Sequence, residues 1–194
     1  MIRAGFSFEH PTTGTGTRVL ESDAETQGMG WLLEVTRSSR EPDLGEHLHR
    51  TWTETFEIVR GTARYGLGGR EGTAKAGESF VVAPGQLHIH PWNATDEVLV
   101  YRQRNRFAGS SPAAVQDILG MLATRAGMIR DGVEPSGAFG RLMQQAVRLR
   151  TAVRHETYLA KPAAGAQRLT GATLGVLGGW LGYRAIRPAY VGEA

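Results

Sequence analysis

His47, His49 and Glu54 lie close together in the sequence and carry side chains that can bind a metal ion. Side chains two residues apart on a β-strand point to the same face, so both imidazoles can reach one ion. Glu54 begins the next apolar run, from which its carboxylate would face back across the sheet. This mixture of imidazole and carboxylate suits Fe, Mn, Ni, Co, Zn or Cu better than Ca²⁺ or Mg²⁺.

A later segment supplies a fourth candidate ligand, His88, and a neighbouring histidine, His90. Pro84-Gly85 predicts a tight turn, and His88 follows that turn into a strand. His90 would face the same side as His88 if the strand continues to Pro91. Because four ligands already serve, we interpret His90 as a candidate general base. The alternatives are a hydrogen-bond donor to a ligand, a substrate contact, or a residue that only lines the interior.

The elements that must position these residues are short strands. Apolar runs alternate with turn signals such as Gly61, Gly77 and Pro84-Gly85. This spacing predicts an all-β sandwich or barrel over residues 1–107. The runs cover residues 30–36, 54–59, 62–65, 78–82 and 98–102.

The hydrophobic period changes after residue 110, and residues 108–194 are predicted to form a helical tail. Ser111-Pro112 is a typical helix start. Apolar residues then recur at helical spacing over three segments. The predicted helices cover residues 111–130, about 137–159 and about 166–183.

The third predicted helix has two different sides. One side carries bulky residues such as Leu177 and Trp180, and the other carries glycines that allow a partner backbone to come close. Its uncharged run, residues 169–183, is shorter than the roughly 20 residues that a membrane span needs. We expect this tail to pack on the barrel or on a second subunit rather than on a membrane.

Composition excludes several classes of site. The chain has no cysteine, so it forms no disulfide, thiolate metal site or cysteine nucleophile. The formal net charge is only +3 and the arginines are scattered, which does not favour a nucleic-acid partner. The N-terminal residues lack the apolar stretch of a secretory signal, so we expect a cytoplasmic protein.

The two histidine segments resemble the two motifs of the cupin superfamily. His47, His49, Glu54 and Gly61 match the first motif without a gap, and Gly77, Gly85 and His88 match the second. Two residues depart from the second motif: Ala83 replaces its first proline, and Asn93 comes one residue later than the family asparagine. The chain also resembles bacterial single-domain cupins with a helical tail, through residues 10–14 and 181–184.

The resemblance implies a double-stranded β-helix, or jelly-roll barrel, with a three-histidine, one-glutamate metal site. It implies one divalent transition metal, with Fe favoured and Mn, Ni, Zn or Cu as alternatives. It also implies a homodimer. We expect a metal-dependent enzyme, most favourably an oxygenase that acts on a small apolar or aromatic molecule. The alternatives are a non-redox cyclase, isomerase or lyase, and a non-catalytic cupin that binds or senses a small molecule.

Overall fold

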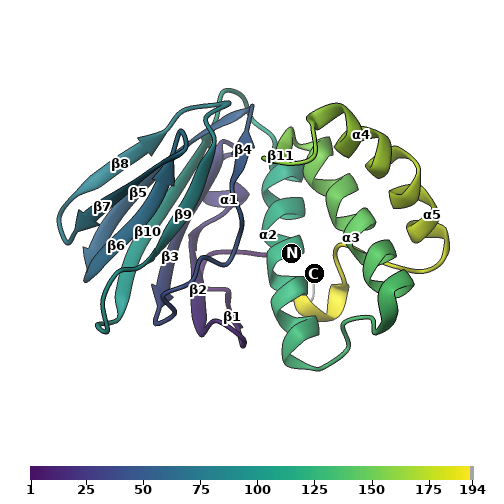
Figure 1. The fold of residues 1–194 in the computed structure, drawn as a ribbon, viewed down its shortest axis with the longest axis horizontal. Coiled ribbons are helices and arrows are strands. Elements are labelled where there is room, and N and C mark those ends of the chain that lie inside the picture. The colour runs from purple at the N-terminus through teal and green to yellow at the C-terminus, as the bar shows by residue number, and fades with distance from the viewer. Residues whose placement is uncertain (193–194) are drawn as a thin grey trace.

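The computed structural model describes residues 1–192, and it contains two antiparallel β-sheets beside a group of helices (Figure 1). All strand pairings in both sheets are antiparallel. The first sheet consists, in spatial order, of β1 (Ser7–His10), β2 (Thr15–Glu21), β3 (Gly30–Arg37), β10 (Leu99–Phe107), β5 (Trp52–Arg60) and β8 (Ser79–Val82).

The second sheet carries most of the candidate site. Its strands, in spatial order, are β11 (Thr157–Leu159), β4 (His47–His49), β9 (His88–Asn93), β6 (Thr62–Leu67) and β7 (Arg70–Lys75). The predicted all-β class with a C-terminal helical extension is therefore confirmed. The five apolar runs correspond to β3, β5, β6, β8 and β10, whereas β1, β2 and β7 are more polar and were not predicted.

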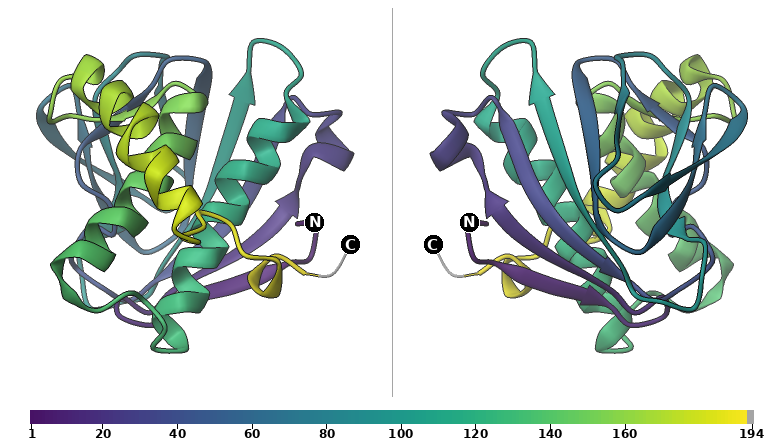
Figure 2. Two further views of the ribbon diagram at one scale, coloured as in Figure 1. Left: turned by 90° about the vertical axis from the view of Figure 1, so that its right-hand side faces the viewer. Right: turned by 90° about the vertical axis from the view of Figure 1, so that its left-hand side faces the viewer.

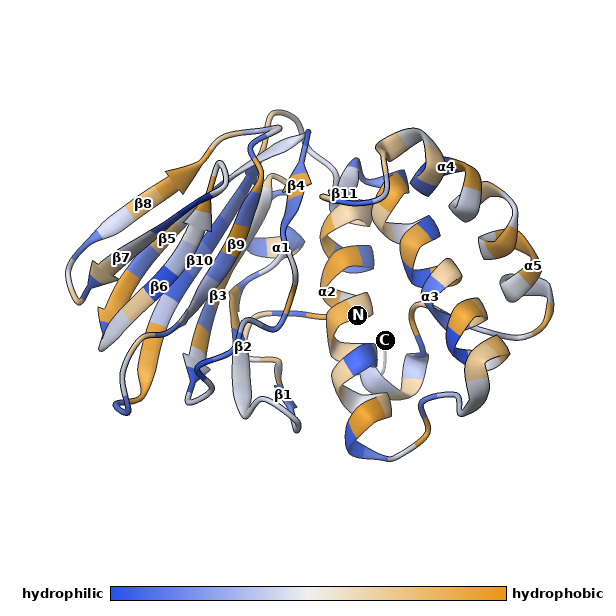
Figure 3. Cartoon of the chain, viewed as in Figure 1, coloured by the Kyte–Doolittle hydropathy of each residue, from blue (hydrophilic) through white to orange (hydrophobic). Residues whose placement is uncertain are grey.

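Aromatic side chains fill the space between the sheets. Trp31, Trp52 and Phe107 pack edge to face, with ring centroids 5.1–5.7 Å apart. Along β10 every second residue is buried, which is the period expected when one face of a strand meets the core. Figure 3 shows the corresponding succession of hydrophobic and hydrophilic bands along the strands.

The helices lie on one side of the sheets (Figures 1 and 2). They are α1 (Asp23–Thr26), α2 (Pro112–Arg130), α3 (Gly137–Arg154), α4 (Ala164–Ala172), α5 (Leu174–Trp180) and a 3₁₀ turn (Pro188–Tyr190). Val115 and Leu119 of α2 are fully buried and join the same apolar core as the strands. The amino group of Met1 lies 3.4 Å from the carbonyl oxygen of Gly192, so the first and last described residues meet.

The second predicted helix is shorter than expected, because α3 ends at Arg154 instead of continuing to about residue 159. Residues 157–159 form the strand β11, which pairs with β4. The run Thr157-Tyr158-Leu159 is rich in residues that favour strands. The unpaired edge of β4 then provides hydrogen-bond partners that decide its conformation.

The third predicted helix is divided. Thr173 separates α4 from α5, and α5 ends at Trp180 rather than at residue 183. Its glycine side approaches a backbone as predicted, and the partner is α3 of the same chain. The opposite side is open, and Trp180 is 84% exposed. A second subunit on that side stays a prediction. Within residues 1–192, no helix has the length and hydrophobicity needed to cross a membrane.

Gly175→Ala should destabilise the protein, because a Cβ there would lie 2.8 Å from the backbone oxygen of Ala146. Overpacking of this kind costs about 1–3 kcal/mol. Gly179→Ala on the same helix is the control, since its added Cβ would meet nothing within 4 Å in residues 1–192 apart from its chain neighbours and the adjacent backbone of its own helix. Urea denaturation of both variants measures the free energy of unfolding. Equal values for the two variants would refute close packing between α3 and α5.

Candidate metal centre

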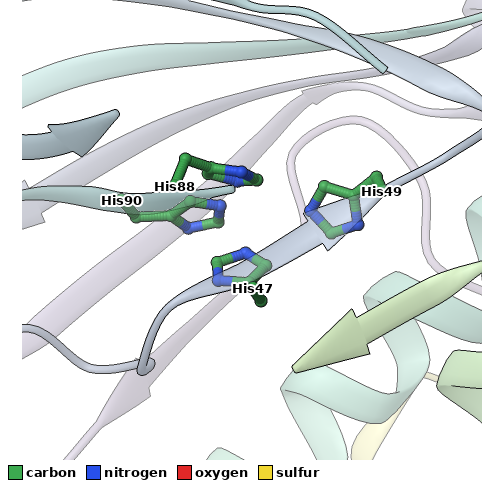
Figure 4. A group of neighbouring side chains, drawn as sticks. All are labelled: His47, His49, His88 and His90. Carbon is green, nitrogen blue, oxygen red and sulfur yellow. The ribbon is translucent and has the colours of Figure 1, made fainter. Parts of the chain in front are cut away.

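Two neighbouring strands bring four histidines together. His47 and His49 come from β4, His88 and His90 come from β9, and His47 is paired directly with His88. One nitrogen of each ring lies within 4.8 Å of one nitrogen of every other ring. Figure 4 shows the four rings converging on one point between the two strands. The two-residue spacing on each strand places both rings on the same face, as the sequence indicated.

Glu54 reaches this cluster from β5 of the other sheet. Its Oε2 atom lies 2.9 Å from His88 Nε2 and 3.3 Å from His90 Nε2. Its Oε1 atom lies 3.5 Å from His49 Nε2. All five residues singled out from the sequence therefore meet at one place. Their division into four ligands and one base stays a prediction, because His90 lies as close as the others.

Hydrogen bonds from Nδ1 to backbone carbonyls orient two of the rings. His47 Nδ1 lies 2.8 Å from the carbonyl oxygen of Gly45, and His88 Nδ1 lies 3.0 Å from that of Gln86. A carbonyl can only accept, so both Nδ1 atoms carry the proton. The Nε2 atoms of both rings are then left with a free lone pair, which is the form that binds a metal.

One oxygen of the Glu54 carboxylate, Oε1, accepts hydrogen bonds that hold the side chain in place. Trp52 Nε1 and Gln103 Nε2 donate to Oε1 over 3.3 Å and 3.2 Å, and Asn105 Nδ2 donates to the same atom. The sequence analysis missed Gln103 and Asn105. The sequence pattern that could have identified them is their alternation with three arginines along β10. The uncharged amides face inward and the arginines face outward.

Burial keeps two of the imidazoles neutral. It lowers the pKa of His49 to about 3, an effect that the Glu54 carboxylate partly opposes. Burial and the three other histidines lower the pKa of His47 well below its usual value. Burial opposes ionisation of Glu54, but the surrounding histidines outweigh it and hold the pKa of that carboxyl well below its usual range. Neutral imidazoles beside a carboxylate are ready to bind a cation.

The metal-binding atoms that face the centre make no hydrogen bond to the described protein residues. Nε2 of all four histidines and Oε2 of Glu54 are buried without a hydrogen-bond partner in residues 1–192. A buried polar atom left unpaired costs about 1–3 kcal/mol. One nitrogen of each histidine lies within 4.8 Å of those of the others, with the Glu54 carboxylate beside them, and this imidazole and carboxylate set fits a divalent transition metal.

A stack of aromatic rings leads away from the centre. Phe56 lies 5.3 Å from the His90 ring and 5.0 Å from Phe80, and Phe80 is stacked on Tyr65 at 3.8 Å. Phe56 is fully buried, whereas Phe80 and Tyr65 are partly exposed. His90 is itself 19% exposed, and the other three histidines are less so. The centre is thus most open on the His90 side, next to aromatic surface.

Comparison with known proteins assigns the family. Residues 35–101 match the family model described as a cupin domain, and this range contains all five site residues. Residues 35–101 are a cupin domain. The double-stranded β-helix expected from the two motifs is therefore confirmed, and so is the recognition of a cupin with a helical extension. No curated protein sequence matches the chain.

Similar solved structures cover about half of this chain. A predicted oxalate decarboxylase from Thermotoga maritima is 17% identical with a TM-score of 0.45, over 48% of this chain and 80% of that one. A double-stranded β-helix protein from Klebsiella pneumoniae is 19% identical with a TM-score of 0.41, over 48% and 77%. A cupin from Bacteroides fragilis is 18% identical with a TM-score of 0.40, over 46% and 75%.

The displaced asparagine of this cupin has a structural explanation. In the pairing of β9 with β6, His90 and Pro91 together oppose the single residue Tyr65. This is a β-bulge, which adds one residue and reverses the side-chain alternation beyond it. Asn93 is buried, accepts from the Thr95 backbone over 3.1 Å and donates to the Glu97 carbonyl. The bulge thus absorbs the extra residue, and His90 is part of it.

Without metal, this cupin should lose stability as the pH falls from 7 to 5. His49 titrates near 3 in the folded protein and near 6.5 when unfolded, so across that window the unfolded chain binds the extra proton. Stability is therefore complete above about pH 6.5 and decreases as the pH falls toward 3. One such histidine contributes a loss of about 2 kcal/mol between pH 7 and 5.

Urea midpoints of chelator-treated protein at both pH values measure this effect. A His49→Asn variant is the control and should depend less on pH. Identical midpoints for the wild-type protein at pH 7 and pH 5 would contradict burial of neutral imidazoles.

Proposed function

We propose that this protein is a metal-dependent cupin enzyme that acts on a small apolar or aromatic molecule, most favourably as an oxygenase. The observation that carries the proposal is the set of five buried, unpaired donor atoms on His47, His49, Glu54, His88 and His90. Three histidines with Glu54 would hold one divalent transition metal, with Fe favoured. Homodimer formation and a cytoplasmic location are part of the same proposal.

The bound ion supplies the chemistry that side chains lack: a redox ion such as Fe enables reactions with dioxygen, and Zn or Ni acts as a Lewis acid. The chain's own residues do the rest. Glu54 neutralises part of the charge of the ion and is held in place by its three donors. The aromatic surface beside His90 excludes water and favours a flat, apolar substrate.

His90 is positioned to handle a proton. Its Nε2 is buried 3.3 Å from Glu54 Oε2, and the ring that carries it is the most accessible of the four. A substrate hydroxyl that enters along the aromatic rings would meet this nitrogen. We assign His90 as the base that takes the hydroxyl proton, with Phe56 packed against its ring.

Purified protein should contain one transition metal ion per chain, and elemental analysis measures it. Protein reconstituted with Fe(II) should consume O₂ when small phenolic compounds are supplied. Zn-loaded protein, which binds at the same ligands, is the control and should consume none. Turnover without O₂ uptake would point to the non-redox reaction. Protein that binds ligands but turns over none would favour the sensing class.

His90→Gln should keep the metal and lose turnover by about 10²–10⁴-fold, because it removes only the positioned base. His88→Gln should lose both metal and turnover. Metal content and initial rates of the two variants are compared at equal protein concentration. If His90→Gln empties the site, His90 is a ligand and this division of roles is wrong.

A further inference from the structure

The helical tail contributes a strand to the sheet that carries the histidines. β11 pairs with all three residues of β4, with Thr157 opposite His49 and Leu159 opposite His47. Backbone bonds extend the contact at both ends: Arg50 donates to Glu156 over 3.0 Å, and Ala160 donates to Glu46 over 2.8 Å. On its other side β4 pairs with β9 at a single position, and the Gly85 amide donates to the His49 carbonyl over 2.6 Å. Most of the support of this histidine strand therefore comes from the tail.

The side chain of Thr157 contacts the metal centre. Its Oγ1 lies 3.0 Å from His49 Nδ1. If His49 binds an ion through Nε2, its proton resides on Nδ1 and is donated to Oγ1. The hydroxyl then donates onward to the carbonyl oxygen of His155 over 3.5 Å. Thr157 thus does for His49 what backbone carbonyls do for His47 and His88.

The helices hold β11 firmly in place. Gln167 of α4 is buried, accepts from the Leu159 backbone over 3.0 Å and donates to the Leu159 carbonyl over 2.8 Å. Tyr158 is buried with Arg50 and Arg168 over its ring, and Arg168 Nε donates to its hydroxyl over 2.7 Å. A strand fixed on both sides can hold a neighbouring side chain in one orientation.

A second connection joins this region to α2. His155, at the end of α3, lies 2.8 Å from Asp117 of α2, and its side chain is only 11% exposed. The backbone carbonyl of His155 accepts the hydrogen bond from the Thr157 hydroxyl. The path from α2 to the His49 ring consists of these contacts and does not pass through the barrel.

We propose that the tail is part of the metal centre, with Thr157 as the positioning residue that fixes the His49 ring for metal binding. This inference rests on the proposed function, because it requires that an ion binds at His49. It assigns to the tail a role beyond covering apolar surface. Metal affinity is then set in part by a residue 108 positions away from its histidine.

Co²⁺ affinity of Thr157 variants tests the role of the hydroxyl. Thr157→Val keeps the shape and strand preference but removes the hydroxyl, and loss of such a partner typically lowers metal affinity about 10–100-fold. Thr157→Ser keeps the hydroxyl and should restore the affinity. Thr151→Val removes a tail hydroxyl that bonds only within α3, and is the matched control.

The thermal midpoint of each metal-free variant separates positioning from folding. A structural role alone would lower the midpoint of Thr157→Val and would leave the affinity and absorption spectrum of bound Co²⁺ unchanged. Wild-type affinity in Thr157→Val would overturn the inference. Failure of the wild-type protein to bind Co²⁺ would instead overturn the proposed function.

Hydrogen exchange gives a readout that needs no variant. If metal binding depends on the position of β11, then binding must stabilise that position by the same free energy. Co²⁺ should therefore slow exchange of the Ala160 and Arg50 amides, which join β11 to the flanks of β4. Exchange that Co²⁺ leaves unchanged at both amides, in protein shown to bind the ion, would also overturn the inference.

Discussion

The dominant constraint on this protein is the burial of five polar atoms around one centre. Unpaired buried atoms at about 1–3 kcal/mol each add up to a sum comparable with the whole stability of a domain, about 5–15 kcal/mol. The surroundings offset this cost. His47, His49 and His88 each make a hydrogen bond through Nδ1, on the side that faces away from the centre. Glu54 Oε1 likewise accepts hydrogen bonds from three side chains.

Both sheets are needed to build the centre, because the imidazoles come from one and the carboxylate from the other. The aromatic core holds them at this separation. Trp52 serves twice: its ring stacks on His49 at 4.2 Å, and its Nε1 donates to Glu54. The same residue packs against Trp31 and Phe107. The packing of the barrel core therefore also sets the geometry of the site.

The helical tail changes how the barrel ends. A three-residue strand such as β4, paired once on one side, would present an unpaired edge beside the histidines. β11 covers that edge and is itself fixed by α4. The contacts of the tail with the sheet reach the His49 ring through Thr157. One segment thus closes the sheet and completes the environment of a candidate ligand.

The sequence alone predicted the fold class, singled out the five candidate site residues and placed the change from strands to helices near residue 110, because alternation, motif spacing and helical period are local patterns. Three features needed the tertiary structure. Glu54's amide donors and Thr157 lie far from their partners in sequence, and β11 became a strand because β4 offered an open edge. The bulge at His90–Pro91 depends on pairing with β6. In each case a partner distant in sequence, invisible to local pattern, decides the conformation.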